Sequence, residues 1–491
     1  MGITNRLNRE NLKRGINYFK RNGITASIVK AAERISRDSD EKDYGKEYDS
    51  SDVFSEIALK EQWEIESKRQ FTHSYKISIV VPAYETNSEY FREMVLSVIN
   101  QSYSNWELCI ADSSKSNSVF DVVEALKAEF ADINLPEKLK YLRLLENEGI
   151  SKNTNHALEL ASGEYIGFMD HDDILTPNAL YEVMEALEEG LENDGLSYKN
   201  RYKIIYSDED KTNSDRTKYF DWHRKPDFDI DLLRTNNYVC HFLVVRKELC
   251  DSVDGFDSRF DGAQDHDFVL RCYEKAGAKS IKHINKVLYH WRSHEASTAT
   301  NPESKMYAYN AGKRAIEAHL ERMHINAKVL DTQHLGFFRV KYDVTAEELT
   351  QVKIMSLDEL KAESYDDIIN DETKYIMVLN DNVKPLNDEF IEELLGHVKR
   401  PEVGCAGSLV IGKNGKIESA GYVRHGDNIE AEFAGLNRYF SGYLHRAKLQ
   451  RRVDGVCTDC MMIKKEAITP DKTLSENYIV VYTPYSIFKR R

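Results

Sequence analysis

The chain has 491 residues, of which 41% are hydrophobic and 30% charged, and its formal net charge is −15. This length accommodates two or three domains, and the composition is that of a water-soluble globular protein. The acidic balance argues against nucleic-acid binding, and no apolar stretch reaches the length of a membrane span. Seven cysteines in so long a chain do not form a disulfide framework, and no apolar signal-peptide core opens the sequence, so a cytoplasmic setting is expected.

The first 75 residues form a separate N-terminal region. Residues 1–37 carry nine Arg or Lys and two Glu, and Leu12, Ile16 and Phe19 lie at helical spacing. A basic amphipathic helix can lie on an anionic membrane surface, and we expect peripheral contact with the inner face of the cell membrane. The alternative is a solvated helix that packs on the main domain. Residues 38–52 are acidic and polar, as in a linker.

After a predicted helix at 53–70, β-branched apolar runs alternate with segments of helical spacing. The runs predict buried strands and the spaced segments predict helices. Such alternation is typical of an α/β sandwich around a mostly parallel sheet, in which ligands bind beyond the carboxyl ends of the strands. The predicted strands are 76–85, 106–114, 139–147 and a run ending at Asp170, and the predicted helices are 89–103, 119–131 and 149–163.

The strand "GEYIGFM" ends abruptly in Asp170, His171, Asp172 and Asp173. Closely spaced carboxylates bind a hard cation, share a proton, or lie in a solvated turn, and one D-x-D triplet is weak evidence because this chain has another acidic run at 208–210. Oxygen ligands in a short strand-end loop suit Mg²⁺ or Mn²⁺. No glycine-rich phosphate loop follows a strand, so a phosphorylated substrate would be held through the metal.

Five motifs between Lys76 and Ala299 together resemble the family 2 glycosyltransferases, most closely the bacterial members that build surface polysaccharides. The resemblance implies a Rossmann-like GT-A fold, a nucleotide-sugar donor and inversion of the anomeric centre. It also implies a catalytic domain over residues 76–300. The motifs are "ISIVVPAYE", "WELCIADSS", "ENEGISKNTNHALELASGEYIGFMDHDD", "GAQDHDFVLR" and "VLYHWRSHEASTA".

The resemblance implies where the donor binds. The nucleoside is expected after the first strand, its base against Asp112, and the ribose and diphosphate near the third strand. Asp172 matches the metal ligand of the family's D-x-D pair, with Mg²⁺ or Mn²⁺ bridging the diphosphate. Asp173 is expected to bond the sugar or to cap the next helix. The implied donor-binding residues are Pro82, Tyr84, Glu85, Asp112, Asn147, Gly149, Asn155 and Asp170.

The resemblance also implies an acceptor side. Asp265 matches the family's general base, which takes a proton from the acceptor hydroxyl. Gln264 stands where relatives often carry Glu and is expected to contact sugar or acceptor, whereas Asp267 is expected to bond backbone. A further segment looks family-like without individual chemistry being assigned, and it contains Pro226, Asp227, Asn237 and His241.

The late motif "YHWRSH" offers the remaining site residues. In this fold a late histidine completes the metal shell, and His290 is the better match, with His294 the alternative. Each histidine taken alone can equally be a surface residue. Arg292 is expected to pair with diphosphate oxygens, because a guanidinium matches them bidentately, and His294 and Arg292 are also grouped with the sugar and acceptor contacts.

Residues 301–334 are predicted as a helical connector and 335–491 as an incomplete second transferase-like domain. "TKYIMVLNDNVKPLNDEFIEELLGHV" repeats the order strand, acidic corner, proline and helix. Asn382 stands where a metal-binding Asp is expected, and the segments for the nucleoside and the base are missing, so this domain is predicted to be non-catalytic. "CTDC" at 457–460 is too little for zinc and lacks a redox context.

Three functions compete. The first is a metal-dependent inverting glycosyltransferase that extends a cell-surface or lipid-linked glycan from a UDP-sugar, with dTDP as the alternative. The second is a nucleotide-sugar phosphohydrolase that uses the aspartate cluster, although that class places its ligands on helices. The third is a glycan-binding or scaffold protein with a relic site, which fits the second domain better than the first.

Overall fold

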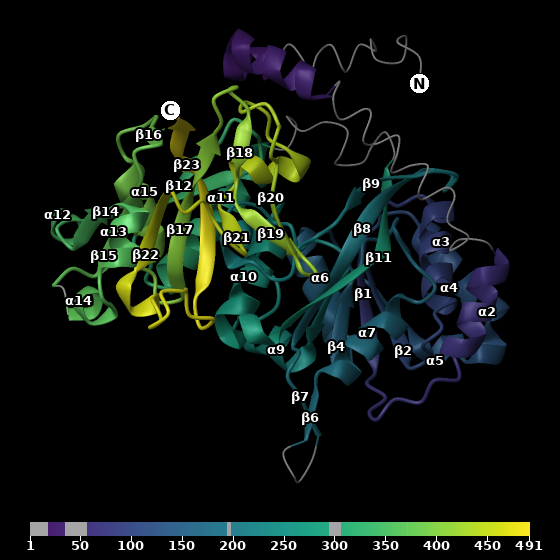
Figure 1. Ribbon diagram of the computed structural model, residues 1–491. Coiled ribbons are helices and arrows are strands. Elements are labelled where there is room, and N and C mark those ends of the chain that lie inside the picture. The colour runs from purple at the N-terminus through teal and green to yellow at the C-terminus, as the bar shows by residue number, and fades with distance from the viewer. Residues whose placement is uncertain (1–17, 35–55, 194–197, 294–305, 371) are drawn as a thin grey trace. The chain divides into compact units, whose positions relative to one another are not determined.

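A computed structural model describes the chain in two compact units (Figure 1). The first unit comprises residues 40–228 and 237–323, and the second unit residues 1–39, 229–236 and 324–491. None of the described helices is long and apolar enough to cross a bilayer. The described residues are 18–34, 56–193, 198–293, 306–370 and 372–491.

The first unit contains a nine-stranded sheet in the order β3-β2-β1-β4-β10-β8-β11-β5, with β9 paired to β8. Strands β1 to β4 run parallel, and beyond them the sheet is mixed, because β10 is antiparallel to both β4 and β8. The predicted α/β class is confirmed. The strands are β1 (Ile77–Ala83), β2 (Trp106–Asp112), β3 (Leu139–Arg143), β4 (Tyr165–Phe168), β5 (Ile174–Leu175), β8 (Ile204–Asn213), β9 (Tyr219–His223), β10 (Leu243–Arg246) and β11 (Ile281–Ser293).

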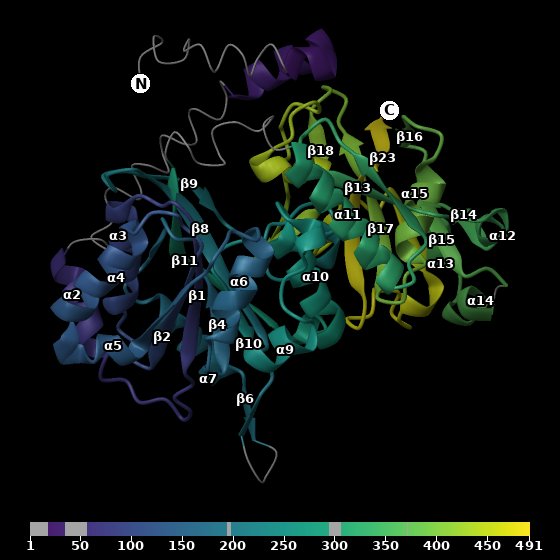
Figure 2. The ribbon, with the colours of Figure 1, turned by 180° about the vertical axis from the view of Figure 1, so that it is seen from behind.

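Helices flank this sheet and bury its strands. Every residue of β1 and β2 is buried, as expected for strands covered on both faces. Helix α6 contacts β1 and β2 and stands in front of them in Figure 2. A small hairpin of β6 (Leu191–Asn193) and β7 (Tyr198–Asn200) lies apart. The helices are α2 (Glu56–Glu66), α3 (Ser88–Ile99), α4 (Ser118–Glu129), α5 (Leu135–Lys138), α6 (Ile150–Glu159), α7 (Ala179–Glu189), α9 (Lys247–Ser252), α10 (Gln264–Ala276) and α11 (Met306–Arg322).

The second unit contains an eight-stranded sheet in the order β14-β15-β22-β17-β23-β16, to which β18 and β21 are paired at the side. Helix α8 (Ile230–Leu233) belongs to this unit. The strands are β12 (Ala327–Asp331), β13 (Phe338–Tyr342), β14 (Val352–Met355), β15 (Tyr375–Leu379), β16 (Val383–Pro385), β17 (Val403–Ile411), β18 (Ile417–Ser419), β19 (Tyr422–His425), β20 (Asn428–Ala431), β21 (Arg451–Val453), β22 (Cys460–Lys464) and β23 (Ile479–Arg490). The other helices are α12 (Ala346–Leu349), α13 (Leu357–Ala362), α14 (Tyr365–Asn370) and α15 (Phe390–Val398).

A buried ion-pair network holds α8 within the second unit. Arg400 binds Asp231 through both Nη atoms, at 2.8 and 2.9 Å, and Asp229 accepts a hydrogen bond from the backbone N of Arg452. The predicted second sheet domain is present. The predicted domain boundaries remain a prediction, and the helix expected as a connector, α11, is part of the first unit.

Candidate active site

The acidic corner lies at the carboxyl edge of the first sheet. Backbone N of Met169 donates to the carbonyl of Val80, so β4 ends level with the interior of β1. The chain then turns and returns as β5, where Ile174 pairs with His290 on β11. Residues 170–173 therefore form a tight corner that is fixed on both sides by sheet pairing.

Tyr289 holds the corner from β11. Its hydroxyl donates to Asp173 Oδ2 at 2.6 Å and accepts from the backbone N of Asp170 at 3.1 Å. Asp173 is 1% exposed, and its other oxygen accepts from the backbone N of Arg292 at 2.8 Å. Burial, and then the charges of Asp172 and Asp170, raise the pKa of Asp173 well above its usual value. The helix cap expected at Asp173 is wrong, because Asn178 directly precedes α7.

Arg292 is part of the scaffold of the corner. Its side chain is fully buried, and its Nη2 binds Glu93 Oε2 at 2.6 Å. Its Nε donates to the carbonyl of Asp172 and its Nη1 to the carbonyl of Ser214. Because the guanidinium is used in this way, the expected pairing with diphosphate oxygens is not supported. Arg292 instead fixes the backbone that presents the Asp172 carboxylate, which is 21% exposed.

The two predicted late histidines give different outcomes. His290 stands directly opposite Asp210 in the β11–β8 register, and its Nδ1 lies 2.5 Å from Asp210 Oδ1. It therefore points to the face of the sheet opposite Tyr289 and does not join the corner. His294 lies outside the described residues. The sugar or acceptor role assigned to it stays a prediction.

His241 occupies the position expected of His290. Within the described part of the chain, the side chains able to hold a metal ion in a group are Asp170, Asp173 and His241, whose ligand atoms lie within 4.8 Å of one another. Nε2 of His241 is 4.0 Å from Asp170 Oδ2, and its ring stacks on Tyr289 at 4.7 Å. Burial lowers the pKa of His241, but surrounding carboxylates, Asp170 first, outweigh it and raise the pKa above its usual value.

The corner fits a divalent cation. Three carboxylates follow one another within four residues, and the mutual repulsion that raises the pKa of Asp173 is the repulsion that a cation would remove. Carboxylate oxygens with one imidazole are a suitable donor set for Mg²⁺ or Mn²⁺. Asp170 has 49% of its side chain exposed, so this donor faces solvent. Asp170, Asp173 and His241 are the side chains whose ligand atoms lie close enough together to share an ion, whereas Asp172, the ligand expected from the sequence, stays a prediction.

The loops after β1 and β2 form the predicted nucleoside edge. Pro82 pairs with Ala111 inside the sheet, whereas Tyr84 just beyond it is 44% exposed. The Glu85 carboxylate accepts from the backbone N of Lys115 at 2.7 Å and from the Ser116 hydroxyl, which lowers its pKa. Tyr84 is thus presented to solvent, while Glu85 links the two loops.

Asp112 is the least accessible of the predicted donor residues. It has no exposed surface, and its Oδ2 accepts from Tyr141 at 2.7 Å and from Arg143 at 2.9 Å. Its Oδ1 accepts from the backbone N of Ser114. A base can reach this carboxylate only if the Arg143 side chain moves. The predicted base contact therefore stays a prediction that this conformation does not support.

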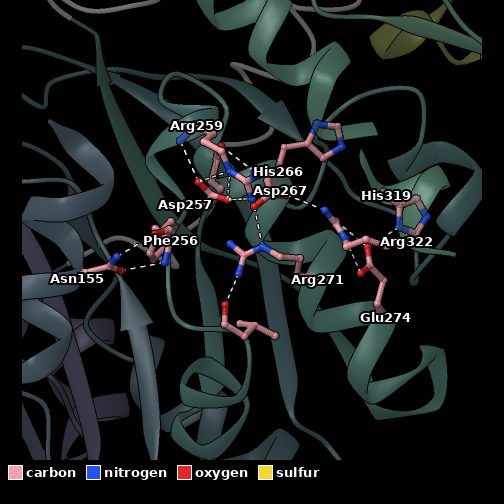
Figure 3. A network of polar contacts seen from close by, with 12 residues as sticks. Asn155, Phe256, Asp257, Arg259, His266, Asp267, Arg271, Glu274, His319 and Arg322 are labelled. Atoms are coloured by element: carbon pink, nitrogen blue, oxygen red, sulfur yellow. Dashed lines mark hydrogen bonds and ion pairs between the residues drawn. The ribbon is translucent and has the colours of Figure 1, made fainter. Parts of the chain in front are cut away.

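The residues predicted to lie near the ribose and diphosphate have different roles in the structure. Oδ1 of Asn147 accepts from the backbone N of Gly149, which adopts a φ of +97° at the start of α6. A Cβ at Gly149 would lie 2.7 Å from Asp261 Oδ2. Both this close approach and the positive φ favour glycine at this position. Asn155 binds both the N and the O of Phe256 through its amide, as Figure 3 shows. Asn155 is therefore a structural clamp, and its predicted role in donor binding is not supported.

Helix α10 presents the predicted base at its first turn. Asp265 Oδ2 accepts from Asn237 Nδ2 at 2.8 Å, and its Oδ1 accepts from the backbone N of His266. Burial raises the pKa of Asp265, partly offset by His241. Gln264 Oε1 accepts from the backbone N of Gly262, which places this side chain at the helix entry. Asp265 and the acidic corner are thus within electrostatic reach of one another through His241 and Asp170.

A buried network fixes α10 from behind (Figure 3). Asp267 Oδ2 binds Arg271 Nε at 2.7 Å, one helical turn on, so the predicted backbone role of Asp267 gives way to an ion pair. Glu274 binds His319 and Arg322 of α11, each at 2.7 Å. These contacts use charged groups that burial makes costly to leave unpaired, and they hold the base helix in place.

Sequence reasoning missed the chemistry of two residues, His241 and Asn237. Both lie in the segment that looked family-like but received no role. The available signal was their position: they flank a loop that enters the strand next to β4. His241 lies two residues before Leu243, the first residue of β10, which pairs with Phe168 of β4.

The region that contains this segment matches a known protein family. Residues 78–253 match the family model described as Glycosyl transferase family 2. Uncharacterized protein y4gI of Sinorhizobium fredii is 30% identical over 84% of this chain and 50% of its own length. O-antigen biosynthesis protein RfbC of Myxococcus xanthus is 28% identical over 71% of this chain and 30% of its own length. The chain thus spans half or less of the length of these two curated relatives.

One solved structure illustrates the structural comparison. Staphylococcus aureus TarS 1-349 in complex with UDP-GlcNAc has a TM-score of 0.38 and 20% sequence identity, and the match covers 50% of this chain and 66% of that chain.

Proposed function

Because residues 78–253 form a family 2 glycosyltransferase domain, we propose that the first unit transfers a sugar from a nucleotide-sugar donor to a hydroxyl group of a bacterial cell-surface glycan. The observation that carries the proposal is the meeting, within the first unit, of a metal-competent corner, Asp170 to Asp173 with His241, and a half-buried carboxylate, Asp265. The similarity to RfbC, which is named an O-antigen biosynthesis protein, supports a polysaccharide acceptor, free or lipid-linked.

The proposed reaction inverts the anomeric centre. The acceptor oxygen forms a bond to the anomeric carbon while Asp265 takes the proton from that hydroxyl. The bond from the anomeric carbon to the diphosphate oxygen breaks on the opposite face, and the nucleoside diphosphate leaves. Asp170 and His241, with Asp172 as a further proposed ligand, would hold a Mg²⁺ or Mn²⁺ ion, which would supply positive charge for that leaving group. Arg292 and Tyr289 hold the backbone and side chains of the corner in position.

The nucleotide is proposed to be UDP, with dTDP as the alternative. Exposed Tyr84 at the end of β1 offers a flat surface against which the base can stack. The second unit is proposed to be non-catalytic, with glycan binding or stabilisation as its role. A nucleotide-sugar phosphohydrolase is less well supported, because the acidic corner follows a strand, whereas that class places its metal ligands on helices.

The experiment is a nucleotide-release assay on the full chain with UDP- and dTDP-sugars, with and without Mn²⁺ and an oligosaccharide acceptor. We expect release that requires both the metal and the acceptor and produces an extended glycan. Equal release without acceptor would favour hydrolysis. A thermal-shift series with the same nucleotides adds a binding readout, since a ligand of the native state raises the melting temperature, and Asp172→Ala should abolish the metal-dependent part.

We also propose peripheral contact with the inner face of the cell membrane, through the helix at residues 18–34. One side of this helix is held in the second unit, where Glu33 accepts from backbone N of Ser441 and Gly442. The opposite side presents Ile24 and Ile28, which are 65% and 64% exposed. Lys20 and Arg21 are also exposed and precede these side chains in the chain, so cations accompany the apolar side chains, as binding to an anionic lipid surface requires.

Vesicle sedimentation tests this contact. The full chain should bind phosphatidylglycerol vesicles more strongly than phosphatidylcholine vesicles, and Ile24→Asp with Ile28→Asp should remove the difference. Lys413→Gln with Lys416→Gln, at exposed residues of the second unit, changes the net charge by the same amount and is the matched control. Unchanged binding by the isoleucine variant would show that the helix is not the docking surface.

A further inference from the structure

The loop before β10 carries a contact to the proposed base. Asn237 Nδ2 donates a hydrogen bond to Asp265 Oδ2 at 2.8 Å, and the backbone N of His266 donates to the other oxygen. The carboxylate is therefore held at both oxygens in one orientation. Only the Asn237 contact comes from a distant side chain, 28 residues earlier in the chain.

This loop is anchored from beneath. Lys225, whose side chain has no exposed surface, donates through Nζ to the carbonyl of Val239 at 2.7 Å and to that of His241. Glu209 Oε2 accepts from the backbone N of His241. Oδ1 of Asn237 accepts from the backbone N of Cys240 at 3.4 Å, so the same amide closes the loop and reaches the base. Asn237 is thus placed by a rigid support.

We propose that Asn237 is a positioning residue for sugar transfer, whose amide N–H aims the Asp265 carboxylate at the acceptor hydroxyl and favours its ionised form. This inference rests on the proposed function. A hydrogen bond donated to a carboxylate stabilises the charged state, and the charged state is the one able to accept the proton. Donor and metal binding involve the other end of the loop, at His241, and do not need the Asn237 amide.

Other groups also act on Asp265. Burial and the charge of Asp170 raise its pKa, whereas His241 and the backbone N of His266 lower it. The thiol of Cys240 also lies within the field of Asp265. Removing the Asn237 donor leaves these influences in place, so the pKa of Asp265 should rise. The acid limb of the pH–rate profile should then move to higher pH.

The test uses two variants of the full chain. Asn237→Asp keeps the shape and the oxygen that faces Cys240 but replaces the donor with a second carboxylate. Asn237→Leu removes the donor without adding charge. We expect kcat for transfer to fall about 10- to 100-fold in both and the acid limb to rise by about one pH unit, more for Asn237→Asp. The Kd of UDP with Mn²⁺ should stay within about twofold of the parent.

The controls separate this inference from the function on which it rests. Asn105 directly precedes the amino end of β2, whereas the proposed site lies at the carboxyl edge of the sheet. Asn105→Asp makes the same chemical change there and should alter neither kcat nor the pH profile. If Asp265→Asn is inactive but both Asn237 variants keep the parental pH profile, Asn237 has only a structural role. The inference about Asn237 is then wrong, and the proposed function is unaffected. If Asp265→Asn keeps its activity, the base assignment and this inference fall together.

Discussion

The sheets of the two units follow the same path over six strands. In the first unit the order is β1-β4-β10-β8-β11-β5, and in the second it is β14-β15-β22-β17-β23-β16, with parallel and antiparallel pairs in the same sequence. Among its described residues the second unit has no counterparts of β2 and β3, and it therefore has no equivalent of the loop after β2 that belongs to the predicted nucleoside edge. Between β22 and β23 the described chain has a short 3₁₀ turn where the first unit has α10. The second unit thus keeps the six-strand framework but lacks, in its described residues, the nucleoside edge and the base helix that sugar transfer is proposed to need.

The corners show how the second sheet neutralises its acidic side chains without a metal ion. Asn380 replaces the first aspartate, and Arg490 pairs with Val383 in the sheet as His290 pairs with Ile174. The Arg490 guanidinium binds Asp459 and, at 2.5 Å, Glu418. A permanent side-chain cation therefore neutralises the acidic groups of this corner. The difference teaches that the corner geometry is a property of the sheet, whereas metal binding depends on a few replaceable side chains.

The largest effect is expected from the base, which has no counterpart in the second unit. Asp265→Asn should lower kcat for sugar transfer by about 10³-fold, because the acceptor hydroxyl loses its proton acceptor. Melting temperature and metal-dependent UDP binding should be unchanged. The measurement is product formation at saturating donor. A variant with more than a tenth of the parental rate would remove Asp265 from the mechanism.

A second change makes the first corner resemble the second. Asp170→Asn with Asp172→Asn should abolish the rise in melting temperature produced by UDP with Mn²⁺, which at about 100 times Kd corresponds to about 2.7 kcal/mol. The reverse change, Asn380→Asp with Asn382→Asp, made in addition to the first pair, should not restore the rise, since the second unit has no counterpart of the nucleoside edge among its described residues. Metal-dependent stabilisation of this double variant would contradict the proposed ligand set.

The third change removes the internal cation of the second unit. Arg490→Met should lower the free energy of unfolding by about 1–3 kcal/mol, because Asp459 and Glu418 lose their partner in a partly buried position. Denaturant unfolding measures it. Lys489→Met, the neighbouring cation on β23, is the control and should cost less. Equal losses would show that the guanidinium contributes no more than any surface charge.

The smallest effect is expected at the remaining aspartate of the second corner. Asp381 is exposed, and Asp381→Asn should change the free energy of unfolding by no more than about 0.5 kcal/mol. Transfer activity and metal-dependent nucleotide binding should also be retained. A clear loss of either function would mean that the second corner takes part in the reaction after all.

The sequence by itself determined the sheet class and the position of the acidic corner, because these depend on local patterns, whereas the base was assigned from the family resemblance and stays a proposal. Buried β-branched runs define β1, β2 and β4, and the polar residues that follow such a run must lie at its carboxyl end. The repeat in the second unit was also readable, since strand, corner and helix recur in the same order.

Only the tertiary structure decided which side chains join the corner. Neighbouring residues of a strand point to opposite faces, so one step along β11 separates Tyr289, which binds Asp173, from His290, which binds Asp210. Arg292 turned inward because Glu93, 199 residues earlier, lies beside it. Pairings over such sequence separations depend on register, which local composition does not encode.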